Sequence, residues 1–510
     1  MSRPANGRES PAPLHLSILL VVPKAPLNEV VPVTEPTRRP VWFVLTRHWL
    51  GLVGAALITS AVISWLFVLP LQIRGHVDNP YVGVVVFLVL PAVFFLGLAL
   101  IPLGVYLGKR RILQGFEEAA FERKAALQRL GLFLGVTTFL NVLIGTQFTY
   151  RAVKHMETPQ FCGQSCHTMK PEFSAYLNAP HSEIECVECH VAPGAAGWIA
   201  SKTAGIRQVF EMASGTFPRP IPSPLEGNRL VSAAETCENC HWSQAFGSVR
   251  LRLITNYAED EKNTRTQTVL MMMVGGSKFG GIHGRHFGPG IHIRFAVSDP
   301  QRQTIPWVEY QNAITGVVKR FATSDSSADA LKDLPKYEMQ CVDCHNRPAH
   351  TFESPERGMN NALFLGQIAT TLPFVKKEGV EVLKAEYSSS EEAAAKLPAT
   401  FTNFYRQNYP EVYAQTAQDI QQAAQVVLAI YNRNVFPDMK VGWGTYPNNL
   451  GHTDFPGCFR CHDGAHMDEH GEAITQDCNS CHNTLAMDEA SPEILKTLGI
   501  EERISKMQKQ

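Results

Sequence analysis

All twelve cysteines of the chain occur in six pairs, and a histidine directly follows the second cysteine of each pair. Two residues separate the cysteines in five pairs, whereas three separate Cys162 from Cys166 in the first. The C-x-x-C-H spacing is the attachment signature of c-type haem, in which two thiols form thioethers to the porphyrin and the histidine can bind its iron. We therefore expect six covalently bound haem c groups. Their predicted thioether residues are Cys162, Cys166, Cys186, Cys189, Cys237, Cys240, Cys341, Cys344, Cys458, Cys461, Cys478 and Cys481, and their predicted motif ligands are His167, His190, His241, His345, His462 and His482.

Zinc sites and disulfides are the competing uses of paired cysteines. A zinc site needs four ligands that converge from two pairs, and it gives no reason for a histidine after every second cysteine. A disulfide framework is chemically permitted outside the cytoplasm, but it is also indifferent to that histidine. The repeated histidine therefore favours haem attachment, and six haems in one chain must lie close together, as in a row of redox groups that passes electrons.

The second axial ligand of each iron is expected to come from histidines outside the motifs. His181 shortly precedes the second motif, and His350 ends the run Asn-Arg-Pro-Ala-His after the fourth motif. A glycine-rich run from 280 to 290 lets the backbone approach a flat macrocycle, and it contains two further histidines. We predict distal ligands at His181, His283, His286, His350, His452 and His466, and we expect His292 and His470 to be bystanders.

Three stretches that contain no Asp, Glu, Lys, Arg or His are long enough to cross a bilayer, at 49–71, 81–107 and 130–150. Six lysines and arginines lie between the second and third stretches, whereas only Arg74 lies between the first and second. The positive-inside rule therefore places the N-terminus in the cytoplasm and the chain after Tyr150 in the periplasm of a bacterium, anchored in its inner membrane. Because no histidine lies within a span, we expect no haem inside the bilayer.

The predicted fold is three N-terminal transmembrane helices followed by a periplasmic multihaem cytochrome c domain, which is mainly α-helical and irregular with a β-rich insertion. Eight prolines in the first 40 residues indicate a disordered cytoplasmic tail. The balance of 46 Lys and Arg against 47 Asp and Glu removes the electrostatic case for nucleic-acid binding. The predicted parts are the tail at 1–48, a three-helix anchor at 49–150, a module with haems 1–3 at 151–250, the β-rich insertion at 251–335 and a module with haems 4–6 at 336–510.

The residues from Phe161 to Pro218 resemble the NapC/NirT family of membrane-anchored multihaem quinol dehydrogenases. Later runs are similar to those of larger inner-membrane cytochromes from metal-reducing bacteria. The resemblance is carried by Cys166-His167-Thr168-Met169, His181, the second motif, Lys202 and Gly215-Thr-Phe-Pro218. It implies that electrons enter at the haem nearest the membrane, whose iron is held by His167 or Met169, and that Lys202 lies beside the quinol. Gln208 stands where family members often have an aspartate, with Glu211 nearby, so the proton acceptor stays open.

The expected function is that of a quinol:cytochrome-type oxidoreductase, which takes electrons from menaquinol or ubiquinol at the periplasmic face and passes them to a periplasmic redox protein. Lys202, Gln208 and Glu211 are its predicted quinol site. A quinol gives up two electrons whereas a haem accepts one, so a neighbouring haem must take the first electron away. The alternative is a relay subunit of a larger respiratory or photosynthetic complex, in which a partner subunit oxidises the quinol. A terminal reductase is disfavoured because the chain contains no C-x-x-C-K motif.

Overall fold

The computed structural model describes residues 48–73, 89–112, 119–165, 167–226, 230–241, 247, 249–276, 280–327 and 329–507. The predicted tail before residue 48, the start of the predicted second span at 81–88, and Cys166 lie outside these residues, as does the side chain of His167. The chain divides into two compact units, Met1–Tyr150 and Arg151–Gln510.

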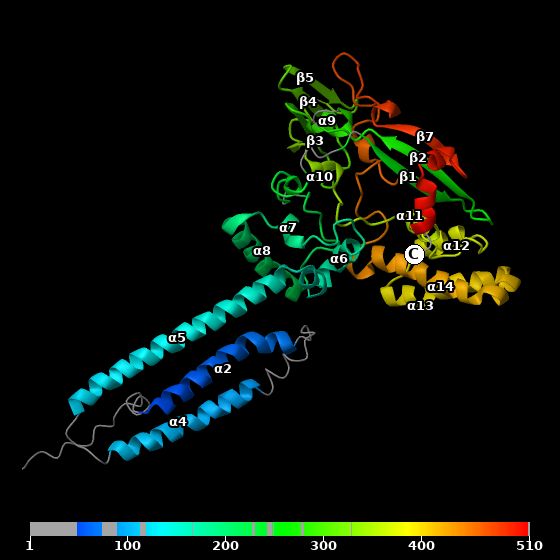
Figure 1. Cartoon of the computed structure of the whole chain (residues 1–510). Coiled ribbons are helices and arrows are strands. Elements are labelled where there is room, and N and C mark those ends of the chain that lie inside the picture. Colours follow the sequence, from blue (N-terminus) through cyan, green and yellow to red (C-terminus); the bar gives the residue numbers. More distant parts are fainter. Residues whose placement is uncertain are drawn as a thin grey trace, which may run out of the picture. The chain divides into compact units, whose positions relative to one another are not determined.

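The described part of the N-terminal unit contains three apolar helices, namely α2 (Trp49–Ile73), α4 (Leu90–Ile112) and α5 (Ala119–Glu157), of which α5 continues into the second unit (Figure 1). Each contains a window that is long and apolar enough to cross a membrane, at Trp49–Leu66, Leu90–Leu107 and Leu127–Glu157. The three predicted spans are thereby confirmed as candidate membrane helices. Glycines let α2 and α4 approach closely, since a Cβ atom added to Gly54 would lie 2.7 Å from the carbonyl oxygen of Gly97.

The second unit begins with short helices and contains two antiparallel sheets. The helical elements here are η2 (Phe161–Ser165), η3 (His167–Met169), α6 (Lys170–Tyr176), α7 (Cys186–His190), α8 (Gly194–Ser214) and η4 (Cys237–Asn239). One sheet has the order β1-β2-β7 and the other the order β5-β4-β3-β6. Their strands are β1 (Arg250–Tyr257), β2 (Arg265–Met272), β3 (Ile291–Ala296), β4 (Trp307–Asn312), β5 (Val317–Ala322), β6 (Lys336–Glu338) and β7 (His482–Glu489), with α9 (Gly281–Phe287) between β2 and β3.

The strands between residues 250 and 338 form the whole of the β5-β4-β3-β6 sheet, but the other sheet extends beyond this region. β2 pairs with β1 on one side and with β7, close to the C-terminus, on the other. Strand pairing can join residues far apart in the sequence, so no local sequence pattern predicts that β2 pairs with β7. The region predicted as an insertion therefore shares a sheet with residues that follow the sixth motif.

A layer of helices between the fourth and fifth motifs contains the largest hydrophobic core of the second unit. Ser354 caps α11 by accepting a hydrogen bond from the backbone N–H of Arg357, and Ser389 caps α13 in the same way from Glu392. Leu397, Phe401 and Tyr405 are fully buried on α13. The helices are α11 (Pro355–Phe364), α12 (Val375–Lys384), α13 (Ser390–Asn408) and α14 (Pro410–Asn434). The remaining elements are α10 (Cys341–Cys344), η6 (Pro437–Met439), η7 (Gly457–Arg460), η8 (Cys478–Ser480), α15 (Glu493–Thr497) and α16 (Ile500–Met507).

Candidate functional site

Each C-x-x-C-H motif from the second to the sixth forms one turn of helix, in α7, η4, α10, η7 and η8. In the third, fourth and fifth motifs the backbone N–H of the histidine donates to the carbonyl of the first cysteine, over 2.8 Å to Cys237, 2.8 Å to Cys341 and 3.1 Å to Cys458. Residues three apart lie on the same face of a helical turn, so both thiols of a motif can reach one porphyrin.

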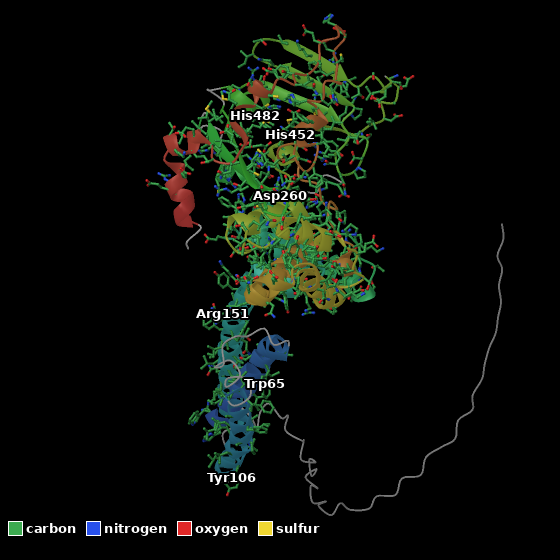
Figure 2. All side chains as sticks on the ribbon, turned by 90° about the vertical axis from the view of Figure 1, so that its right-hand side faces the viewer. Trp65, Tyr106, Arg151, Asp260, His452 and His482 are labelled. Carbon is green, nitrogen blue, oxygen red and sulfur yellow. The ribbon has the colours of Figure 1, made fainter. Side chains whose placement is uncertain are left out.

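Five motif histidines each face a histidine from outside the motifs. The ring centroids are 5.9–6.2 Å apart in all five pairs. Figure 2 shows one of these pairs, His452 and His482, side by side. The pairs are His190 with His350, His241 with His181, His345 with His283, His462 with His286, and His482 with His452.

This spacing matches two imidazoles on opposite faces of one iron. A metal–histidine bond is about 2 Å long and a ring centre lies about 1 Å beyond its nitrogen, so the two centroids are about 6 Å apart. Aromatic rings in ordinary contact cover a similar range of distances, so one pair alone would decide little. Five pairs that each join one motif histidine to one other histidine fit axial ligation of haem iron.

Backbone carbonyls orient several of these rings. The Nδ1–H groups of His181, His286 and His350 donate to the carbonyls of Pro348, Ile282 and Glu172 over 3.2, 2.7 and 3.0 Å. The Nδ1–H group of His462, a motif histidine, donates to the Thr475 carbonyl over 2.7 Å. A carbonyl can only accept a hydrogen bond, so each ring has its proton on Nδ1 and keeps the Nε2 lone pair for a metal.

Burial keeps several paired imidazoles uncharged. It lowers the pKa of His350 to about 4, although the bond to the Glu172 carbonyl acts in the opposite direction. It also lowers the pKa values of His283, His286 and His345 from their ordinary value. A neutral imidazole offers the lone pair that iron requires.

The structure does not bring His466, the remaining predicted distal ligand, to a motif histidine. Its buried ring donates from Nε2 to the Ile305 carbonyl over 2.6 Å, and its Nδ1 lies 2.8 Å from Asp463 Oδ1. Both nitrogens are thus used in hydrogen bonds that hold the loop after the fifth motif, which is a structural role. His292, expected to be a bystander, is exposed and lies 2.9 Å from Glu338 Oε1.

Cysteines of consecutive motifs are neighbours from the first motif to the sixth. A hydrogen bond with Cys186 lowers the pKa of Cys162 to about 7. Burial raises the pKa of the later thiols, and thiols of the adjacent motif raise it further. These electrostatic effects act between Cys189 and Cys237, Cys341 and Cys237, Cys344 and Cys458, and Cys481 and Cys458. The attachment positions therefore form an unbroken row in the order of the sequence.

In the predicted quinol site, Gln208 and Glu211 lie apart from Lys202. Lys202 and Glu211 are both on α8, and nine residues of helix amount to two and a half turns, or about 13 Å along the axis, so they face opposite sides. Gln208 is exposed, and Glu211 Oε1 lies 3.4 Å from Arg207 Nε on the same helix. The structure does not bring Lys202 together with Gln208 and Glu211.

Lys202 instead lies beside the last residue of α5. Its Nζ is 3.7 Å from Glu157 Oε1 and 5.5 Å from the centre of the Trp198 ring. Its charge also helps to lower the pKa of Cys162 in the first motif, after the larger effect of Cys186. Glu157 was missed by the sequence reasoning because a carboxylate after an apolar span is usually an ordinary helix end. Met169, the alternative iron ligand, is half-buried in η3.

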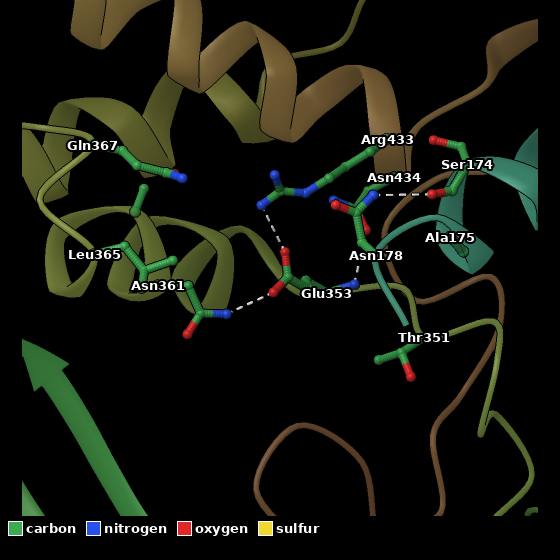
Figure 3. A pocket seen from close by; sticks show the side chains of 11 residues that line it. Ser174, Ala175, Asn178, Thr351, Glu353, Asn361, Leu365, Gln367, Arg433 and Asn434 are labelled. Atoms are coloured by element: carbon green, nitrogen blue, oxygen red, sulfur yellow. Dashed lines mark hydrogen bonds and ion pairs between the residues drawn. The ribbon is translucent and has the colours of Figure 1, made fainter. Parts of the chain in front are cut away.

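A pocket of about 260 Å³ lies between α6, α11 and α14 (Figure 3), and Thr351, the residue after the predicted ligand His350, is part of its lining. Glu353 accepts from Asn361 Nδ2 over 2.6 Å and from Arg433 Nη2 over 2.9 Å, and its backbone N–H donates to Asn434 Oδ1. These contacts tie the segment after His350 to the helical layer. The pocket walls therefore hold in place the segment that follows the predicted ligand His350.

The competing uses of cysteine find no support in the described residues. Within them, no group of three or more His, Cys, Asp or Glu side chains converges as a metal-ion site, and the eleven described cysteines form no disulfide. The donor set and the ring pairs fit haem instead, at the five motifs whose side chains the structure describes.

Comparison with known proteins agrees with this geometry. Residues 124–252 match the model of the NapC/NirT cytochrome c family, N-terminal region. The cytochrome c-type protein ImcH of Geobacter sulfurreducens is 36% identical over 445 residues, which cover 86% of this chain and 87% of ImcH. No solved structure matches the chain. The chain thus belongs to the NapC/NirT cytochrome c family, whose members carry covalently bound haem c and transfer electrons at membranes.

Proposed function

We propose that this protein is a membrane-anchored hexahaem cytochrome that takes electrons from a quinol and passes them along its haem row to a periplasmic redox protein. The observation that carries the proposal is the set of five histidine pairs at consecutive, adjoining motifs. Its cytoplasmic N-terminus and periplasmic haem domain follow from the lysines and arginines between the second and third spans.

Five of the six haems in this proposal have two histidine ligands. The motif cysteines bind each porphyrin, and the paired rings hold the iron from both faces. Haem supplies a centre that accepts and releases one electron, and two imidazole ligands favour electron transfer over substrate binding. The first haem is held by Cys162 and Cys166, with His167 or Met169 on its iron.

Lys202 and Glu157 form the proposed quinol-binding pair beside the first motif. Glu157 ends the third candidate span, so the pair lies at the membrane surface, where a lipid-soluble quinol arrives. The Lys202 ammonium group donates a hydrogen bond to a quinol oxygen, and the Glu157 carboxylate accepts a proton as the quinol is oxidised. Oxidation of one quinol releases two electrons, which pass one at a time to the haem row, and two protons, of which Glu157 accepts one and water at the membrane surface the other. Glu211 stays a secondary candidate because α8 turns it away from Lys202.

Stopped-flow reduction of the purified, haem-loaded full chain by a reduced quinol analogue tests the proposal. Rapid reduction of the wild type is expected, and Lys202→Gln should slow it at unchanged haem content. Arg207→Gln is the matched control, because it removes an exposed cation of the same helix. If the wild type is reduced only when partner subunits are present, the relay-subunit alternative replaces the proposal. If Lys202→Gln reacts as fast as the wild type, the assignment of the quinol site is refuted.

A further inference from the structure

A buried cluster of charges lies between the fourth and fifth motifs. The Arg302 side chain is 5% exposed and its Nη1 donates to Asp343 Oδ1 over 2.8 Å. Its Nη2 donates to the Leu225 carbonyl over 3.3 Å, and its guanidinium group lies 3.8 Å from the centre of the Tyr337 ring. The Asp343 side chain is 3% exposed, and its second oxygen accepts from the backbone N–H of Gln340 over 2.8 Å.

Arg460 connects this ion pair to the next motif. Its Nη2 donates to the Asp343 carbonyl over 2.6 Å, its Nη1 to the Arg302 carbonyl over 2.7 Å, and its Nε to the Gly457 carbonyl over 2.9 Å. Asp343 and Arg460 occupy the same position in their motifs, directly before the second cysteine. Those cysteines are also near enough for the charge of Cys344 to raise the pKa of Cys461, after the larger effect of burial. The three charged residues thus join the two motifs side by side.

The backbone conformation of Arg302 indicates that the contacts of this residue are needed to hold it in place. Arg302 has a φ of 57°, in the left-handed region that favours glycine or asparagine. A residue other than glycine stays in this conformation only where surrounding contacts determine it. The contacts of the Arg302 guanidinium and carbonyl groups hold the residue in this conformation.

The cluster contains two cations and one anion, so it leaves one positive charge between the motifs. In a protein interior such a charge is weakly screened and acts strongly on other charges nearby. Reduction adds one electron at an iron and breaks no bond, so a nearby cation favours the reduced state. A nearby anion favours the oxidised state for the same reason.

We propose that Arg302, Asp343 and Arg460 form a charged bridge that holds the fourth and fifth haem attachment motifs together and raises the reduction potentials of the two haems bound there. This inference rests on the proposed function, since it needs haem at both motifs. The haem attachment motifs alone do not explain reduction potentials. The bridge names the residues that would raise the potentials of the fourth and fifth haems.

Spectroelectrochemical titration of the haem-loaded full chain, reduced with dithionite and a set of mediators, tests the bridge. Arg302→Gln should lower the midpoint potentials of two of the six haems, because it removes a cation. Asp343→Asn should raise the same two, because it removes an anion, and the double variant should return toward the wild type. Arg302→Lys keeps the charge while it loses contacts, so its potentials should stay near those of the wild type. Arg320→Gln removes an exposed cation, paired with Glu309 on the neighbouring strand, and should shift no potential.

Opposite shifts separate an electrostatic role from a packing role. Shifts of the same sign in Arg302→Gln and Asp343→Asn, or no shift in either, overturn the bridge. If Arg302→Gln fails to fold, the sign of the Asp343→Asn shift decides alone. Haem content by the pyridine haemochrome assay and mass of the motif peptides distinguishes the two levels of failure. Missing haem at these motifs in the wild type refutes the proposed function and the bridge together, whereas six haems with unshifted potentials refute the bridge alone.

Discussion

Substitution of His350 tests the assignment of distal ligands most directly. Its ring centroid lies 6.2 Å from that of His190, and its Nδ1–H donates to the Glu172 carbonyl over 3.0 Å. Leucine has a similar volume and cannot bind iron, so His350→Leu should remove one axial ligand and leave the fold in place. Loss of the Nδ1 hydrogen bond costs about 1 kcal/mol, which a domain of this size tolerates.

One of six predicted haems should then lose its low-spin, six-coordinate state. The expected spectrum is the wild-type spectrum with one of the five bis-histidine haems, about a fifth of their low-spin signal, changed to high-spin, because removal of one axial ligand changes the spin state of that iron only. Electron paramagnetic resonance and absorbance of the oxidised protein near the high-spin charge-transfer band measure this fraction. Haem content should not change, since the thioether cysteines are intact.

Two histidines serve as controls for the same measurement. His292→Gln alters an exposed ring paired with Glu338 and should leave the spectrum unchanged. His466→Gln removes buried hydrogen bonds to Asp463 and Ile305, so it should lower the melting temperature and leave the spin states as in the wild type. A high-spin haem in His466→Gln, or a fully low-spin spectrum in His350→Leu, would refute the pairing of rings described here.

Three further predictions concern other parts of the molecule. Glu157→Gln should slow reduction by a quinol analogue without changing reduction by dithionite, because it removes the carboxylate beside Lys202 and not the haems. Burial, and then Glu381, raises the pKa of Glu378 to about 7, so the folded state binds this proton more tightly than the unfolded state, and stability falls as the pH rises from about 4.5 to 7. Glu378→Gln should therefore stabilise the protein at pH 8, by up to about 3 kcal/mol, and have little effect at pH 4, as thermal unfolding at both pH values would show. Gly97→Leu should destabilise the anchor in detergent, measured by its melting temperature, because an added Cβ would lie 2.7 Å from the carbonyl oxygen of Gly54.

Local patterns in the sequence predicted the elements that depend on neighbouring residues. The uniformly apolar stretches correspond to α2, α4 and α5, since a bilayer imposes length and composition on one continuous segment. The C-x-x-C-H spacing corresponds to single helical turns, because residues three apart share a face.

Contacts between segments that are distant in the sequence could not be predicted from local patterns. No local pattern shows that His350, after the fourth motif, faces His190 in the second, or that β7 pairs with β2. His466 illustrates the opposite case, in which proximity in sequence to the fifth motif suggested a ligand. Its ring is turned toward Ile305 and Asp463, and that orientation depends on a strand connection far away in the chain. Sequence position supplied the candidate donors, of which His466 is not brought to a motif histidine, whereas tertiary packing determines which rings face one another.

The histidine pairs join segments that are distant in the sequence, and this has a consequence for biogenesis. In the five pairs, the second ring belongs to a segment outside the motif that it faces, and the partner of His190 is made only after the fourth motif has been synthesised. Covalent attachment needs only the short local motif, so it can precede folding, while the pairing of His190 must wait until the chain has been made as far as His350. A chain that misses the second of its haems would leave the segments around His190 and His350, which are 160 residues apart in the sequence, without the link that the shared iron would supply.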